Sequence, residues 1–102
     1  TYARDLADAI YQVIEQIVAD NRFVRGVYHY SNEGVCSWYD FAKAIAKKSY
    51  SKCKINPIES KDYPTPVKRP FYSVLNKNKI KSVYHITIPH WQESLDNFFK
   101  EI

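Results

Sequence analysis

The stretch Tyr63-Pro-Thr-Pro-Val-Lys-Arg-Pro-Phe-Tyr-Ser-Val-Leu75 decides how the rest of the chain can be arranged. Its prolines, at positions 64, 66 and 70, each fix the backbone angle φ and remove a hydrogen-bond donor. Such a stretch can be neither the interior of a helix nor a central strand. We therefore expect a stiff, extended loop, with helices and strands before and after it in the sequence.

Positive charge gathers around this loop. From Glu59 to Lys81 the chain has six basic residues against two acidic ones, a local net charge of +4. The formal net charge of the whole protein is also +4, so the charges elsewhere cancel. A rigid loop loses little entropy on binding, and Arg69 offers a planar fork of donors, so this part of the chain suits a partner that carries phosphate.

The composition is that of an ordinary globular protein. A chain of 102 residues with 45% hydrophobic and 25% charged residues predicts one domain with a modest core. No apolar run approaches the roughly 18 residues of a membrane span, and the N-terminal sequence lacks a secretion signal. Cys36 and Cys53 form no CxxC pair and are expected to be free thiols in a reducing cytoplasm. The three histidines lack the spacing of metal ligands, so we expect no metal site.

The first half of the chain predicts two helices and two short strands. An amphipathic helix is expected over residues 4–20, with its apolar stripe on a core. Residues 26–31 and 54–58 have the composition of short strands. A second helix should begin at Ser37, because Ser37 and Asp40 are spaced as in a capping box. Trp38 lies on the apolar stripe of this second helix and is expected to be buried.

The second half adds two helices after the proline loop. Asn76 is expected to cap a short helix that ends near Ser82, and residues 85–88 should be extended. A last helix starts at Trp91, with Trp91, Leu95, Phe98 and Ile102 on the side facing the core. A helix between two strands favours a right-handed crossover. The predicted fold class is therefore a small α/β domain with a short parallel strand pair packed by about four helices.

Two catalytic interpretations of the sequence are rejected. The pattern YxxxK, the catalytic pair of short-chain dehydrogenases, occurs at Tyr39/Lys43 and at Tyr50/Lys54. In a chain rich in tyrosine and lysine such matches arise by chance, and with only two glycines there is no glycine-rich nucleotide loop. Glu33 and His29 have no nucleophile beside them. Nucleic-acid binding remains an alternative because of the basic excess, but the aromatic residues sit on helical stripes instead of alternating with Lys and Arg along strands.

Four ordered blocks of sequence together resemble dTDP-4-dehydrorhamnose reductases, which are extended short-chain dehydrogenases/reductases, and specifically their C-terminal portion. The blocks are Thr1-Tyr-Ala-Arg-Asp-Leu-Ala7, Gly26-Val-Tyr-His-Tyr-Ser-Asn-Glu-Gly34 with Ser37-Trp-Tyr-Asp-Phe-Ala42, Tyr63-Pro-Thr-Pro-Val-Lys-Arg-Pro70 with Tyr72-Ser-Val-Leu75 and Lys79, and Pro89-His-Trp-Gln-Glu-Ser-Leu95. They cover nearly the whole chain.

The resemblance implies an enzyme that passes hydride from NADPH, or from NADH, to C4 of dTDP-4-dehydro-L-rhamnose and so makes dTDP-L-rhamnose for cell-surface polysaccharide. In such enzymes an N-terminal Rossmann domain holds the cofactor and the YxxxK pair, and a smaller C-terminal part closes over the sugar nucleotide. Residues 1–102 match that second part, so the chain is expected to be one substrate-binding domain of a longer cytoplasmic enzyme. It lacks the catalytic and cofactor-binding residues and is expected to be inactive alone; a homodimer is compatible with the resemblance.

Arg69 is the leading substrate-binding candidate, because it matches the Arg-Pro that follows the proline loop in the family. In extended members an arginine in this region faces the nucleotide diphosphate. Lys68, Tyr2 and Ser73 are further candidates for the same site. Two alternatives stay open: another extended sugar-nucleotide reductase or epimerase, and a freestanding basic module that binds nucleic acid.

Overall fold

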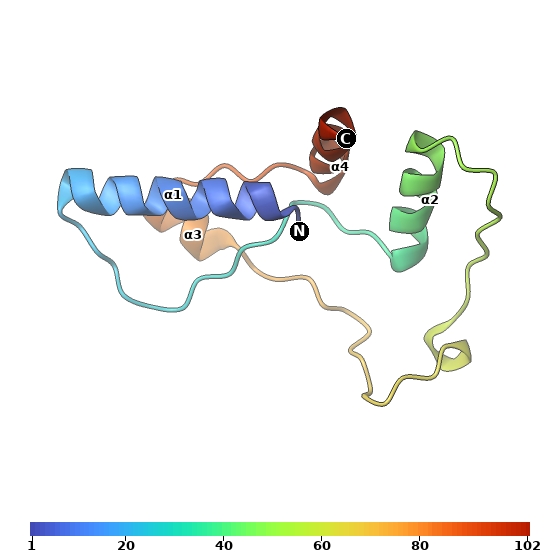
Figure 1. Ribbon diagram of the computed structural model, residues 1–102. Helices are drawn as coiled ribbons and strands as arrows, with labels where there is room; N and C mark the ends of the chain where they lie inside the picture. Colours follow the sequence, from blue (N-terminus) through green and yellow to red (C-terminus); the bar gives the residue numbers. More distant parts are fainter. The chain divides into compact units, whose positions relative to one another are not determined.

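The computed structural model describes residues 1–102 and is helical (Figure 1). Its elements, in chain order, are α1 (Ala3–Asp20), α2 (Trp38–Lys48), the short 3-10 helix η1 (Ser60–Asp62), α3 (Asn78–Tyr84) and α4 (Trp91–Glu101). The four predicted α-helices are therefore confirmed, with bounds that differ from the expected ones by at most a few residues. None of these helices combines the length and the apolar composition that a membrane span requires.

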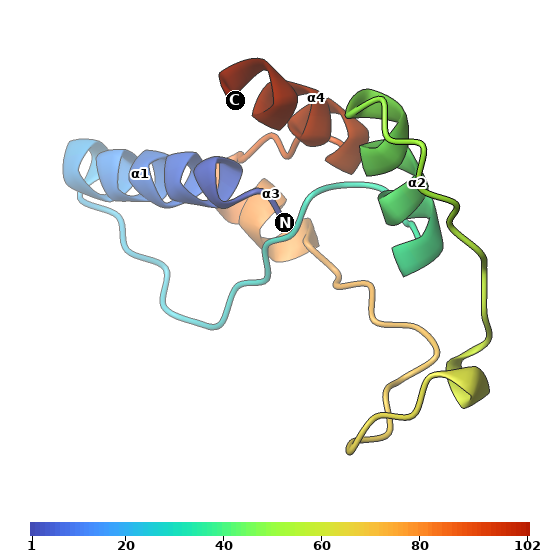
Figure 2. The same ribbon diagram turned by 45° about the vertical axis from the view of Figure 1, so that its right-hand side comes forward.

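The chain divides into two compact units. Unit 1 consists of Thr1–Gly34 and Leu75–Ile102 and contains α1, α3 and α4. Unit 2 is Val35–Val74 and contains α2 and η1, which lies in the long connection drawn in yellow in Figure 2. Every fully buried residue of the protein belongs to unit 1.

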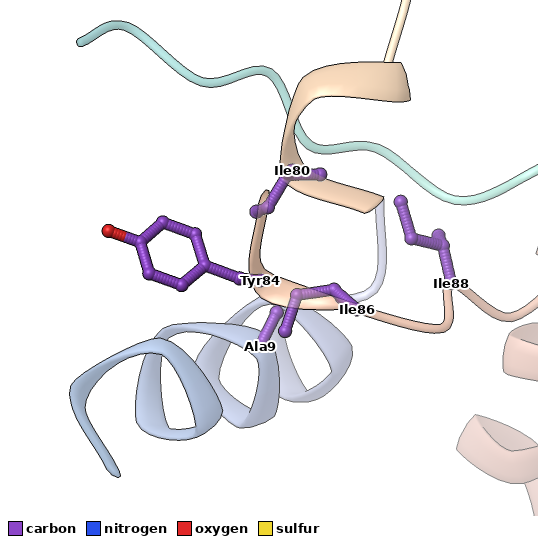
Figure 3. Close-up of a cluster of buried hydrophobic side chains, with 5 residues drawn as sticks. All are labelled: Ala9, Ile80, Tyr84, Ile86 and Ile88. Carbon is purple, nitrogen blue, oxygen red and sulfur yellow. The ribbon is translucent and has the colours of Figure 1, made fainter. Parts of the chain in front are cut away.

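The hydrophobic core of unit 1 is built mainly from α3 and the extended residues that follow it. Ile80, Tyr84, Ile86 and Ile88 are at least 93% buried and meet Ala9 of α1 (Figure 3). Half-buried apolar residues surround this cluster; they are Val13, Ile17, Tyr28, Tyr30 and Val83. The core therefore joins the two ends of the chain, with α3 lying beside α1 in both ribbon views.

Tyr84, a core residue, also accepts two hydrogen bonds. The Tyr84 hydroxyl accepts the backbone N–H of Val24 at 3.2 Å, and its main-chain carbonyl accepts the Gln16 amide at 2.6 Å. Its ring packs against the ring of Tyr28, with centroids 5.4 Å apart. Tyr84 thereby ties the end of α3 both to α1 and to the segment that follows α1.

The predicted parallel strand pair is wrong. Residues 26–31 and 54–58 contain no strand, and the only β-type pairing is an isolated parallel bridge between Glu33 and His90. In that bridge Glu33 donates its backbone N–H to Pro89 O, and Trp91 donates to Glu33 O, both at 2.9 Å. A β-rich composition yields a strand only where a partner backbone lies alongside. Residues 26–31 have no such neighbour, so they run extended without a ladder.

Local capping is confirmed at the start of α2. Asp40 N donates to Ser37 Oγ, and Ser37 N donates to Asp40 Oδ2, each at 3.0 Å, which completes the capping box. At α3 the prediction that Asn76 is the cap is wrong, because the N-cap is Lys77 and it makes no side-chain capping bond; the Asn76 side chain lies one residue earlier and accepts the N–H of Asn78 at 3.0 Å. The start of α2 forms as predicted because it depends on neighbours in sequence.

Several predicted core positions are not covered. On α1 the predicted stripe is only partly buried, because Leu6, Ile10 and Ile14 are exposed while Val13 and Ile17 pack against the core. Trp38 is 77% exposed, because it lies in the first turn of α2 and unit 2 contains no fully buried side chain to pack on. Ile102 lies just beyond α4 and is 78% exposed, and Phe98 is 41% exposed. Of the four apolar residues predicted to face the core in the last helix, only Leu95 is buried.

Candidate functional site

The proline-rich segment of unit 2 is irregular, as its prolines predict. Residues 63–74 contain no helix and no strand, and all of them are exposed. The Thr65 hydroxyl donates to Val67 O at 2.7 Å and so closes a local turn between two of the prolines. A segment with restricted φ angles and an internal hydrogen bond holds its shape without a packed core.

Four of the six basic residues around this segment are already engaged. Lys61 pairs with Glu59 at 2.9 Å, and Lys79 donates to Val27 O at 3.1 Å while lying 4.5 Å from the centre of the Tyr28 ring. Lys77 and Lys81 both pair with Glu33. Of the six basic residues near the proline-rich segment, only Lys68 and Arg69 therefore have no partner within the protein.

Arg69 is fully available to a ligand. Its side chain is exposed and makes no hydrogen bond or ion pair within the protein, and the same is true of Lys68. Ser73, four residues further along the same segment, is exposed and unpaired as well. The guanidinium presents a planar fork of donors that matches two phosphate oxygens. Three of the four predicted site residues thus share one stiff segment.

Tyr2, the fourth predicted site residue, belongs to unit 1 and has its polar groups occupied. Its backbone N–H donates to Asn32 Oδ1 at 2.7 Å, and its hydroxyl donates to Glu101 Oε2 at 2.6 Å. Its ring meets that of Phe98 edge-on, with centroids 6.2 Å apart. In this structure Tyr2 ties the beginning of the chain to α4.

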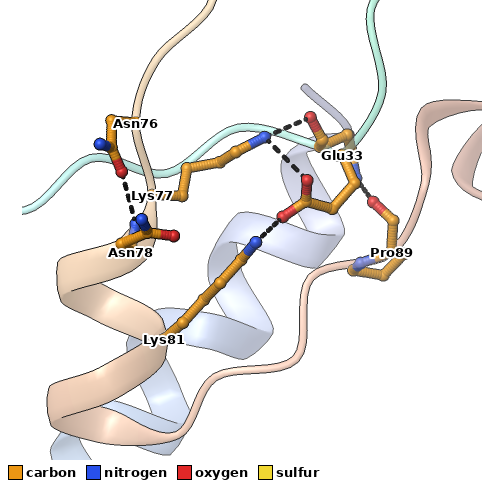
Figure 4. A network of polar contacts seen from close by, with 7 residues as sticks. Glu33, Asn76, Lys77, Asn78, Lys81 and Pro89 are labelled. Atoms are coloured by element: carbon orange, nitrogen blue, oxygen red, sulfur yellow. Dashed lines mark hydrogen bonds and ion pairs between the residues drawn. The ribbon is translucent and has the colours of Figure 1, made fainter.

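A charged cluster around Glu33 was not anticipated from the sequence (Figure 4). The carboxylate lies between two ammonium groups: Lys77 Nζ is 3.4 Å from Glu33 Oε2, and Lys81 pairs with Oε1. Lys77 is 94% buried and also donates to Asn32 O at 3.1 Å. The hydrogen bond from Lys81 and the two nearby positive charges lower the pKa of Glu33, although burial opposes the shift.

Asn32 is the centre of an adjoining polar network. Its side-chain amide donates to Asp5 Oδ2 at 2.7 Å, to Ser94 Oγ at 2.9 Å and to Pro89 O at 3.2 Å. Ser94, which is 98% buried, also donates to Asp5. These hydrogen bonds hold α1, the 32–34 segment and α4 together.

Sequence reasoning missed this network because its members are far apart along the chain. Lys77 and Asn32 are separated by 45 positions, and Asn32 and Ser94 by 62. The available signal was the polar turn Ser-Asn-Glu-Gly at 31–34, placed between an extended apolar run and a helix. A polar turn normally points to solvent, so the sequence alone does not distinguish it from an ordinary loop.

The residues present do not fit a dinucleotide cofactor. A pyrophosphate needs glycine backbone that it can approach closely, and the chain has only Gly26 and Gly34. The Lys79 ammonium group fills the space beside Gly26, and the His90 and Trp91 side chains fill the space beside Gly34. No group of three or more His, Cys, Asp or Glu residues could hold a metal ion, and both cysteines are free and exposed.

Comparisons with known proteins agree on one family. The family described as RmlD substrate binding domain matches residues 1–102. A dTDP-4-dehydrorhamnose reductase from Aggregatibacter actinomycetemcomitans is 37% identical, over 95% of this chain and 35% of its own length. The spore coat polysaccharide biosynthesis protein SpsK from Bacillus subtilis is 36% identical, over 99% of this chain and 33% of its own length.

A solved structure gives the same result. The crystal structure of a dTDP-4-dehydrorhamnose reductase from Clostridium acetobutylicum matches with a TM-score of 0.72 and 30% identity, covering 91% of this chain and 32% of that one. The chain thus spans about a third of the length of the relatives it matches. Because the family match runs from the first residue to the last, this chain belongs to the RmlD substrate binding domain family.

Proposed function

We propose that this chain is the substrate-binding domain of a dTDP-4-dehydrorhamnose reductase, an enzyme that reduces dTDP-4-dehydro-L-rhamnose to dTDP-L-rhamnose. The proposal rests on the family match over residues 1–102 and on relatives that carry this activity in their names. In this proposal residues 1–102 act as one domain of a longer cytoplasmic enzyme.

The family match carries the proposal, and the unpaired guanidinium of Arg69 supports a contact with phosphate within it. The guanidinium is exposed, it lies on a segment that three prolines stiffen, and no acidic side chain neutralises it. We assign it to the diphosphate of the dTDP-sugar, with Lys68 beside it as a second positive charge and Ser73 as a hydroxyl donor. Tyr2 has a smaller part in this proposal because its hydroxyl already donates to Glu101.

The chemistry of reduction belongs to a part of the enzyme outside this chain. NADPH, or NADH, supplies hydride to C4 of the sugar when it is bound. Because the space beside Gly26 and Gly34 is filled by Lys79, His90 and Trp91, we assign cofactor binding to a preceding Rossmann domain. This chain then binds and orients the sugar nucleotide, and it should have no reductase activity alone.

A second candidate is another sugar-nucleotide reductase or epimerase of the same superfamily. The match to the spore coat polysaccharide biosynthesis protein SpsK is nearly as close as the match to a reductase, and its name specifies no sugar. Nucleic-acid binding is less well supported, because four of the six basic residues around the loop already have partners within the protein.

The test is an activity assay on the full-length product of the gene that encodes this chain. We expect oxidation of NADPH that depends on dTDP-4-dehydrorhamnose and is lost with the corresponding UDP-sugar. Turnover of a different dTDP-sugar, with none of dTDP-4-dehydrorhamnose, would favour the second candidate. Absence of turnover with any sugar nucleotide, together with tight and salt-sensitive binding to DNA or RNA, would overturn the enzymatic proposal.

A further inference from the structure

Unit 2 carries the positive charge of this protein. It has eight basic residues against three acidic ones, a net charge of +5, whereas unit 1 has seven basic residues against eight acidic ones. The excess comes from one stretch, because the chain from Phe41 to Ile58 contains five lysines and no acidic residue. We call four of these lysines the lysine patch, because they are exposed and form no ion pair; they are Lys43, Lys47, Lys52 and Lys54.

The lysine patch begins on the side of α2 that lies away from its apolar stripe. Successive residues of an α-helix are turned by about 100°, which places Trp38, Phe41 and Ile45 together on one side. The same rotation places Lys43 and Lys47 on the opposite side. Anything that covers the apolar stripe in a longer protein therefore leaves these two lysines exposed. The other two lysines of the patch follow in the irregular segment after the helix.

Stabilisation of α2 explains only part of this charge. A cation in the last turn of a helix interacts favourably with the free carbonyl groups there, which accounts for Lys47 and for the half-buried Lys48. Lys43 lies one turn earlier, and Lys52 and Lys54 lie beyond the helix. Like charges gathered on one surface repel one another and do not stabilise the fold. Such a surface is typical of proteins that bind an anionic partner.

The residue types in and around the patch favour a membrane surface as that partner. The patch contains lysine and no arginine, so it offers separate point charges and no planar fork for one oriented phosphate. Tyr50 lies among these lysines in the sequence and is 92% exposed, with a positive φ of 55°. Tyrosine is enriched at the level of lipid headgroups, because its ring is apolar and its hydroxyl is polar.

A nucleic acid is less well matched to the same residues. Single-stranded nucleic acids are held by several aromatic rings on which successive bases stack. Between Lys43 and Lys54 there is only one aromatic ring, that of Tyr50. Four to eight basic residues on or beside an amphipathic helix are the pattern of segments that lie on anionic lipid.

We propose that the lysine patch docks this protein reversibly on a membrane surface that contains anionic lipid. This function is additional to the proposed binding of a sugar nucleotide and does not depend on it. The attraction is electrostatic and is therefore screened by salt. Each lysine close to such a surface strengthens binding about fivefold, so four together contribute a factor of several hundred.

The experiment is sedimentation of the full-length protein with vesicles. One set of vesicles contains equal amounts of phosphatidylglycerol and phosphatidylcholine, and the other contains phosphatidylcholine alone. Binding is measured at about 0.05 M and about 0.5 M NaCl, where the screening length changes several-fold. The patch variant replaces all four lysines by glutamine, as Lys43→Gln, Lys47→Gln, Lys52→Gln and Lys54→Gln.

A matched control removes the same amount of charge from exposed cations outside the patch. It combines Arg22→Gln, Arg25→Gln, Lys61→Gln and Lys100→Gln, so both variants have the same net charge. Thermal unfolding of the parent and of both variants confirms that they are folded at the temperature of the binding assay. A single-stranded oligonucleotide of thymidine is tested in parallel as the competing anion.

We expect the parent protein to bind the anionic vesicles at low salt at least about tenfold more tightly than phosphatidylcholine alone, and to dissociate at high salt. The patch variant should lose at least about 100-fold in affinity, and the control less than about fivefold. Equal losses in the two variants would overturn the proposal, as would a parent protein that does not bind the anionic vesicles. Tighter binding of the oligonucleotide than of the vesicles would also overturn it and would assign the patch to nucleic acid.

Discussion

The ammonium nitrogen of Lys77 lies 3.1 Å from the main-chain carbonyl oxygen of Asn32, a residue 45 positions earlier in the chain. The first segment of unit 1 ends at Gly34, and its second segment begins at Leu75, with unit 2 between them in the sequence. This hydrogen bond therefore connects the two segments of unit 1 close to the points where unit 2 is inserted. Lys77 also pairs with Glu33, one residue before the exit point. The two junctions are thereby held by one buried side chain.

Replacing Lys77 should destabilise unit 1. Lys77→Met keeps the aliphatic stem but leaves the Asn32 carbonyl without its donor and removes one positive charge from Glu33. We expect the free energy of unfolding to fall by about 2 kcal/mol, the usual cost of leaving a buried acceptor unpaired. Urea denaturation measures it. The control Lys61→Met alters a lysine whose side chain is 75% exposed and should change stability by less than about 0.5 kcal/mol. Equal effects of the two variants would contradict the anchoring role.

The ion pairs of Glu33 make stability fall in acid. The hydrogen bond from Lys81 and the charges of Lys77 and Lys81 lower its pKa from the ordinary value of 4.5. The folded state therefore favours the carboxylate: the stabilisation is complete above about pH 4.5 and is lost as the pH falls through the lowered folded-state pKa. Denaturation curves recorded from neutral to acid pH should show a smaller acid loss in Glu33→Gln than in the parent protein. Parallel curves would mean that Glu33 does not contribute.

Tyr30 should make the protein sensitive to alkali. Burial, together with the nearby charges of Asp5 and Asp8, raises its pKa to about 12 from the ordinary 10.0. The folded state favours the neutral phenol, so this contribution is present below pH 10 and is lost as the pH rises towards 12. Tyr30→Phe should flatten the decline in unfolding free energy across that range. Tyr63→Phe, at a tyrosine that is 67% exposed, is the matched control and should leave the decline unchanged.

Arg69→Ala in the full-length enzyme tests the assignment of the diphosphate. Hydrogen bonds to a charged group contribute about 1.5–3 kcal/mol, so the KM for the sugar nucleotide should rise roughly 10- to 100-fold. The KM for NADPH should stay nearly unchanged, because we assign the cofactor to another part of the enzyme.

Two further variants sharpen that test. Arg69→Lys keeps the positive charge but loses the planar fork, and it should recover only part of the affinity. Lys61→Ala removes a lysine that is already paired with Glu59 and should leave both KM values unchanged. An unaltered sugar-nucleotide KM in Arg69→Ala would remove Arg69 from the site.

The predicted helices formed because short-range interactions decide them. The capping box of Ser37 and Asp40, for example, needs only residues three positions apart. The two predicted strands failed for the opposite reason, because a strand exists only through the backbone beside it. Residues 26–31 have the right composition, yet no neighbouring strand is present to pair with them.

The candidate site was predicted in part. Pro64, Pro66 and Pro70 indicated a stiff loop, and the structure has an irregular, exposed segment there. The sequence could not say which lysines near that loop are free, because the partners of Lys77 and Lys81 lie more than 40 positions away, at Glu33. Nor could it say that Tyr2 is hydrogen-bonded to Glu101 at the other end of the chain.

By itself the sequence determined the positions of the four helices, the stiff loop and the resemblance to the reductase family, since each of these depends on residue types at fixed local spacing. Only the tertiary structure decided that Lys77 is buried, that Lys68 and Arg69 alone of the six basic residues around the loop remain unpaired, and that Ile10 and Ile14 of α1 are exposed. Burial and charge pairing depend on which segments, distant in sequence, come into contact. In this protein the hydrophobic core between α1 and residues 80–88 determines those contacts.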